Sequence, residues 1–346
     1  MRGLHAFSLF CVLTGGALLS LTGDAHAHAG TDTPLKRVTA ADLAQDKALL
    51  GFQRDLVSVL ALRADPQPLL AAALLARPLP AQPKALGFHA LIERAAAAHG
   101  AGPAITWVRL ADCDPAPEKC PNPDARDALL QQASGNAAVW LLKLGGDVGA
   151  QESAAARQDL ARAAAATSYD DYAGAGLQAL AAAVGTLPPP TATRNPAYAA
   201  GAAATQVMLV FGLGQTLPQP ALQVVARFCE GEKEDTTVKS DCLKLGKNLE
   251  WGSSPLARAL GLHLRETLAT DPAEQTDAAH ARVDLAWQVQ NFAEISARAL
   301  NDTAVAQHLL TLARNGGTEM SLMLAALRDN HVSIDAPPGW SPPAKP

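Results

Sequence analysis

Apolar residues recur at three- and four-residue spacing along most of the chain, a pattern typical of amphipathic helices that pack against one another. Prolines and glycines interrupt the pattern at intervals of ten to twenty-five residues or so, which indicates short loops between helices. The pattern predicts fifteen helices, with the ranges 40–63, 67–76, 83–99, 103–111, 123–133, 137–147, 152–166, 169–184, 196–216, 220–229, 237–250, 255–269, 272–299, 302–314 and 317–329.

Several of these stretches follow a short polar residue and a proline, which is a helix start signal. The polar side chain can accept a free N–H of the first turn, and proline at the first helical position has no N–H to leave unpaired. Glu274 stands three residues after the last of these polar residues, where it would complete a capping box. The five pairs are Asp65-Pro66, Asn122-Pro123, Asn195-Pro196, Ser254-Pro255 and Asp271-Pro272.

Composition supports the same fold class. Alanine supplies roughly a fifth of the chain, and aromatic residues only 4%. Alanine and leucine favour helix, whereas strands are enriched in β-branched and aromatic residues. The prediction is an all-α fold, an irregular right-handed array of antiparallel helical hairpins with no significant sheet.

One uncharged stretch has two interpretations. From Asn195 to Ala226 no residue is charged, and the run is long enough to cross a bilayer. Polar residues such as Gln206 and Gln215 interrupt it, and alanine and glycine are weakly apolar. The sequence therefore favours a central helix buried on all sides, with no stable membrane insertion of the mature chain.

The first residues have the features of a secretory signal peptide. Arg2 supplies a positive charge, residues 6–21 form an apolar run, and Ala25 and Ala27 offer the small residues of a cleavage site. This predicts export to the periplasm or the medium.

The remaining chain divides by its pattern. The expected order is a signal peptide at 1–27, a flexible segment at 28–39, the helical array at 40–334 and a proline-rich tail at 335–346. The array has a candidate subdivision near 186–195, where three prolines stand together. The tail has no helical period, which predicts an extended and loosely attached end.

Four cysteines remain after the predicted cleavage, namely Cys113, Cys120, Cys229 and Cys242. An oxidising compartment preserves disulfides, and the gaps within each pair are wider than those typical of zinc knuckles. Two local bridges, Cys113–Cys120 and Cys229–Cys242, are predicted, although two other pairings and a four-thiolate metal site stay open. The polar 229–242 loop is either only held still by its bridge or presented to a partner.

A single stretch resembles a tetratricopeptide repeat. With Trp140 as the fourth position of a 34-residue unit, Ala156, Leu160 and Ala163 fall where that family has its small, large and small packing residues. The resemblance covers 137–170, and the period continues in neither direction. It implies a helical hairpin with packing roles for these four residues, and a family that binds peptides or proteins.

Few residues suggest chemistry. The sequence contains no GxSxG, HExxH or GxxxxGK(S/T) motif. Asp277, His280 and Asp284 share one face of a predicted helix and are candidate metal ligands or a proton-transfer pair, but the sequence favours a solvated acidic face near a helix start. No cofactor is predicted. The tryptophans at 107, 140, 251 and 287 are expected to fill gaps in the core or, grouped together, to line a groove.

The predicted function is therefore binding. A net charge of −5 argues against a nucleic-acid partner or an anionic membrane, and a protein or peptide partner is expected. One alternative is a cell-envelope hydrolase whose active-site residues are dispersed along the chain. Another is an envelope protein whose cysteine pairs respond to redox conditions.

Overall fold

The structure is a computed structural model that describes residues 39–113 and 120–342. The predicted signal peptide and nearly all of the segment 28–39 lie outside the described residues. Within the described part, the all-α prediction is confirmed, because the β pairing there consists of one isolated bridge between Asn136 and Ser168. The superhelical, tetratricopeptide-like arrangement stays a prediction.

Fifteen α-helices form in the described residues, one for each predicted stretch. Two short 3-10 turns, η1 (Lys84–Leu86) and η3 (Thr191–Thr193), lie between them. The helices are α1 (Ala40–Leu60), α2 (Pro66–Ala76), α3 (Phe88–Ala97), α4 (Pro103–Arg109), α5 (Pro123–Gln132), α6 (Ala137–Gly149), α7 (Ser153–Ala165), α8 (Ala173–Ala183), α9 (Ala202–Gly214), α10 (Leu222–Gly231), α11 (Thr236–Leu249), α12 (Pro255–Leu268), α13 (Pro272–Ala299), α14 (Thr303–Asn315) and α15 (Glu319–Asp329).

Four of the five polar-proline pairs begin a helix as predicted. The side chains of Asn122 and Asp271 accept backbone N–H groups of the first turns of α5 and α13. The pair at Asn195 forms only a turn, because the backbone takes a positive φ of 56° at Gly201 and α9 begins after it. Glu274 does not complete a capping box and lies instead 3.3 Å from Lys247.

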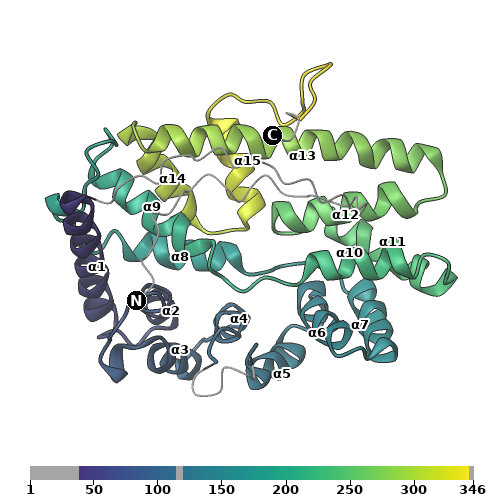
Figure 1. The fold of residues 1–346 in the computed structure, drawn as a ribbon, viewed down its shortest axis with the longest axis horizontal. Coiled ribbons are helices and arrows are strands. Elements are labelled where there is room, and N and C mark those ends of the chain that lie inside the picture. The colour runs from purple at the N-terminus through teal and green to yellow at the C-terminus, as the bar shows by residue number, and fades with distance from the viewer. Residues whose placement is uncertain (1–38, 114–119, 343–346) are drawn as a thin grey trace, which may run out of the picture.

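Buried side chains form two cores. The first core draws on α1–α3, α8, α9 and α13–α15, with Ile105 and Val108 of α4 and Leu262 of α12, and the second draws on α5–α7 and α10–α12, with Trp107 of α4. Figure 1 shows how these helices are arranged. The segment 186–195 joins α8 to α9, and both helices belong to the first core. The long helix α13 runs along one edge of the molecule and packs against α12 as well as α14 and α15.

The uncharged stretch supplies α9, which has buried positions on most of its circumference. It is 13 residues long and packs against α8 and α14. None of the helices in the described ranges combines the length and apolar character that spanning a bilayer requires.

The start of the proline-rich tail is attached to α13, contrary to the expected loose end. The Ala336 N–H donates to Asp284 at 2.9 Å, and the rings of Trp340 and Trp287 meet edge to face at a centroid distance of 5.4 Å. Just before the tail, Trp287 donates its indole N–H to the Ser333 carbonyl at 2.9 Å. The sequence pattern missed this because the attachment uses single side chains, which leave no helical period.

Candidate functional site

The predicted metal ligands do not come together. Asp277 accepts from Arg265 at 3.0 Å, and Asp284 accepts the Ala336 N–H, while His280 is exposed. No three His, Cys, Asp or Glu side chains anywhere in 39–113 or 120–342 are grouped closely enough to hold a metal ion. Asp277 and Asp284 thus have contacts in the fold that need no ion.

Both predicted disulfides are present. Cys113 pairs with Cys120 at a Cα separation of 5.3 Å, and Cys229 pairs with Cys242 at 5.9 Å. The second bridge is fully buried in the second core and joins α10 to α11. Much of the predicted 229–242 loop is helical, because α11 begins at Thr236 with Asp235 as its N-cap. The bridge therefore fixes the orientation of α11.

The repeat-like stretch forms the antiparallel pair α6 and α7. Ala156, Leu160 and Ala163 are buried in the second core, as their predicted packing roles require. Trp140 is only partly buried; its indole N–H donates to the Ser134 carbonyl at 2.8 Å, and the Arg162 guanidinium stacks 4.8 Å from its ring. This tryptophan therefore packs at the edge of the hairpin.

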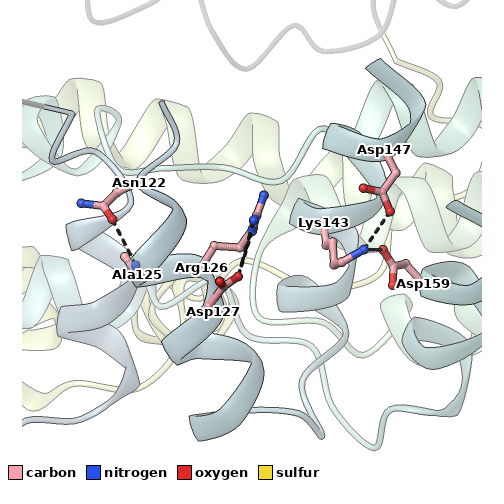
Figure 2. Close-up of polar contacts among 7 residues, drawn as sticks. All are labelled: Asn122, Ala125, Arg126, Asp127, Lys143, Asp147 and Asp159. Atoms are coloured by element: carbon pink, nitrogen blue, oxygen red, sulfur yellow. Dashed lines mark hydrogen bonds and ion pairs between the residues drawn. The ribbon is translucent and has the colours of Figure 1, made fainter. Parts of the chain in front are cut away.

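A charge cluster on this hairpin was not predicted. Figure 2 shows Lys143 of α6 between Asp147 of the same helix and Asp159 of α7, at 2.8 and 2.7 Å. Burial raises the pKa of Asp159 and outweighs the opposing effect of Lys143. Burial acts to lower the pKa of Lys143, but its two carboxylate partners reverse this and raise it. The cluster is a structural link between the two helices, because each charge has a partner.

Three imidazoles pair with carboxylates in separate parts of the molecule. Such pairs resemble the base and orienting acid of a hydrolase. However, no serine, threonine or cysteine of the described residues donates a hydrogen bond to any of these imidazoles. The pairs are His89 with Asp112 at 2.9 Å, His263 with Glu230 at 2.6 Å and His308 with Asp329 at 3.1 Å.

A buried polar junction links the two cores. The loops before α8, α12 and α15 meet there, and the Ser253 hydroxyl donates to Asp171 at 3.1 Å. The Met320 N–H donates to the Ser253 carbonyl at 2.9 Å, so all three loops are tied together. One oxygen of Asp171 has no hydrogen-bond partner among the described residues.

Two carboxyl groups share this junction. Burial raises the pKa of Glu319 to about 7, and the neighbouring charge of Asp171 adds to the shift. No lysine, arginine or histidine in the described part of the chain pairs with Asp171 or Glu319. Three helix N-termini converge there instead, and their dipoles favour negative charge. These dipoles offset the cost of burying the charge only in part, because the pKa of Glu319 stays raised.

A surface hollow follows one face of α11. It measures about 440 Å³, opens to solvent and is lined by residues one helical turn apart, with one residue from the loop after α12. Its lining includes three lysines and no carboxylate. The lining residues are Thr236, Lys239, Ser240, Leu243, Lys244, Lys247 and Thr270.

The lysines of this groove are only weakly engaged. Lys244 lies 3.2 Å from Asp241 and Lys247 3.3 Å from Glu274, and both lysines are more than half exposed. Lys239 has no ion pair in the described structure. Exposed ion pairs contribute about 0–1 kcal/mol, so a bound anion can replace them at little cost.

The α11 groove was not predicted, although its signal is in the sequence. Lys239, Ser240, Leu243, Lys244 and Lys247 recur with the helical period. The sequence pattern does not indicate which face of α11 other helices leave uncovered. The opposite face is closed by α12, where an added Cβ at Gly246 would lie 3.1 Å from the Gly261 carbonyl oxygen.

The predicted role of the tryptophans as core fillers is confirmed only in part. Trp107 is fully buried and donates to the Pro218 carbonyl at 3.0 Å. Trp251 is 77% exposed, directly after α11, and Trp287 contacts the C-terminal segment. Only the first of these three fills the core.

No protein-family model, curated protein or solved structure matches the chain. The fold and its surface define a class only: an all-α protein with two disulfides and an open, lysine-lined groove.

Proposed function

We propose that this protein is an exported binding protein that takes an extended, acidic segment of a partner protein along α11. The observation that carries the proposal is the composition of the groove: three lysines, one leucine and three hydroxyl-bearing residues, without a carboxylate. This local positive charge stands in a chain with a net charge of −5. Charge complementarity between a groove and its partner favours rapid and selective association.

Two further observations support the proposal. Both cysteine pairs are bridged, as expected for a protein that meets an oxidising compartment after export. The α6–α7 pair resembles a tetratricopeptide hairpin, and members of that family bind peptides. The Cys229–Cys242 disulfide, which is attached to the middle of α11, holds this helix in place and so reduces the entropy lost when a partner binds.

The proposal is tested with a fluorescent peptide of eight residues that contains four glutamates, titrated with the mature chain. We expect saturable binding that weakens as salt rises, because exposed charges are screened within about 10 Å at 0.1 M ionic strength. The double variant Lys239→Glu and Lys247→Glu is expected to bind at least tenfold more weakly. The matched control, Lys84→Glu, changes an exposed lysine on η1 and is expected to bind as the wild type does.

Equal affinity of the double variant and the wild type would contradict the proposal. So would turnover of a cell-envelope substrate together with failure to bind any acidic peptide, which is the result expected of the hydrolase alternative. Circular dichroism of each variant establishes that a loss of binding does not come from unfolding.

A further inference from the structure

The C-terminal end of α11 carries an exposed aromatic side chain beside an unpaired cation. Trp251 is 77% exposed, and the Arg258 guanidinium of α12 lies 6.0 Å from the centre of its ring. Leu256, in the first turn of α12, is 47% exposed. Tryptophan and arginine are the residues most enriched at the energetic centres of protein interfaces.

Arg258 is held in place but not neutralised. Its Nε–H donates to the Gly252 carbonyl at 3.1 Å, which orients the guanidinium plane. Burial lowers its pKa, and the charge of Glu250 only partly opposes this. Glu250 itself accepts from Arg265. No carboxylate pairs with Arg258 in the described residues, so this partly buried charge has an unfilled place for an anion.

Position 251 falls in line with the groove along α11. The lining residues Ser240, Leu243 and Lys247 follow the helical period, and the next position of that period is 251. The backbone still turns there, since Glu250 keeps helical dihedral angles and the Trp251 N–H donates to the Asn248 carbonyl.

We infer that Trp251 and Arg258 form an end subsite of the α11 groove, which binds a large apolar side chain of the acidic segment and a carboxylate next to it. The apolar side chain stacks on the exposed indole, and the carboxylate pairs with the guanidinium. This inference rests on the proposed function, because it names the kind of segment that the groove accepts.

The helix geometry gives the spacing of such a segment. At a rise of about 1.5 Å per residue, Lys239 and Lys247 lie about 12 Å apart along α11, and Trp251 lies about 6 Å further on. An extended peptide advances about 3.3 Å per residue. The apolar residue therefore stands about two positions beyond the acid that meets Lys247, and about five or six beyond the acid that meets Lys239.

The test uses two peptides of equal charge, Glu-Gly-Ser-Gly-Glu-Gly-Phe-Glu and the same peptide with serine in place of phenylalanine, each with blocked ends and also in reversed order. In the sequence order that fits the groove, the phenylalanine peptide is expected to bind the wild type at least fivefold more tightly than the serine peptide does. In the variant Trp251→Ala this preference is expected to disappear. The variant Arg258→Gln is expected to bind the phenylalanine peptide more weakly than the wild type does. When the glutamate next to phenylalanine is replaced by glutamine, the variant and the wild type are expected to bind the peptide with similar affinity.

The matched control is Leu62→Ala, which removes an 85% exposed apolar side chain directly after α1 and is expected to keep the preference. In Figure 1, α1 lies at the other end of the molecule from α11. If the phenylalanine and serine peptides bind with equal affinity in either order, and the lysine variants still bind them more weakly than the wild type does, the inference of an end subsite is wrong. The proposal that the α11 groove binds acidic segments is then unaffected. If no peptide binds, or the lysine variants bind as the wild type does, the proposed function fails and this inference fails with it.

Discussion

At the scale of single residues, the same side chain has different roles in different surroundings. Trp107 is enclosed by the second core, and the centre of its ring lies 5.6 Å from that of Tyr172, with the two ring planes tilted by 59°. Trp251 has most of its surface in water, and Trp340 contacts Trp287 on the outside of α13. The sequence predicts that a large aromatic residue fills space, but not whether that space lies inside the molecule.

The buried Trp107 and the exposed Trp251 give a prediction about stability. Trp107→Ala leaves a cavity and an unpaired Pro218 carbonyl, and we expect it to lower the free energy of unfolding by about 3–5 kcal/mol. Trp251→Ala removes an exposed ring and is expected to change it by less than about 1 kcal/mol. Urea unfolding followed by circular dichroism measures both, and equal losses for the two variants would show that the assigned burial is wrong.

At the scale of elements, the helices follow the periodic pattern but their ends follow local backbone geometry. The predicted helix at 169–184 begins only at Ala173, because Tyr172 has a positive φ of 56° that a helix does not allow. The predicted helix at 83–99 is interrupted at Gly87, which separates η1 from α3. The hydrophobic period of the sequence does not predict the dihedral angles of single residues such as these.

The α6–α7 pair gives a prediction for one element. Lys143→Met leaves the buried Asp159 without its closest cation, with Arg162 at 3.7 Å as the remaining one (Figure 2). We expect a loss of about 2 kcal/mol in the free energy of unfolding, less than for a fully buried pair because Lys143 is partly exposed. Asp147→Asn, the matched control, keeps the lysine beside Asp159 and is expected to lose less than about 1 kcal/mol.

Urea unfolding of both variants at neutral pH measures this difference. A loss from Asp147→Asn as large as that from Lys143→Met would mean that the two carboxylates bind the lysine equally, contrary to the greater burial of Asp159.

At the scale of the whole molecule, the polar junction is the point where the two cores are joined. Tyr169 belongs to the second core, and Met320, which follows Glu319, belongs to the first. Asp171 and Tyr169 are the titratable groups that interact electrostatically with Glu319, and Ser253, in the loop before α12, donates its hydroxyl to Asp171. Ionised Glu319 therefore faces a negative neighbour without a cation.

This arrangement predicts how stability depends on pH. The pKa of Glu319 is raised from 4.5 to about 7 in the fold, so the folded state holds a proton that the unfolded state has lost between these values. The stability that comes from this bound proton is fully present below about pH 4.5 and is lost as pH rises through about 7. The loss in the free energy of unfolding is at most about 3 kcal/mol. Glu319→Gln, which keeps a neutral side chain, is expected to be increasingly more stable than the wild type from pH 5 to pH 8.

The measurement is urea unfolding of both proteins across that range, with the difference between them taken at each pH so that other groups cancel. Parallel curves for the two proteins would contradict the assignment of the proton to Glu319. Asp329→Asn is a suitable control, because Asp329 is far from the junction and its pKa is lowered by hydrogen bonding to Arg328.

The sequence by itself determined the helical class and the number of helices in the described chain, and it favoured the two local cysteine pairings that the structure then showed. These depend on spacing along the chain and on intrinsic preference, which are local properties. Only the tertiary structure decided which face of α11 stays open, which tryptophan is exposed and how Asp171 meets Glu319. These features depend on contacts between helices far apart in sequence, and such contacts produce no periodic signal in the order of residues along the chain.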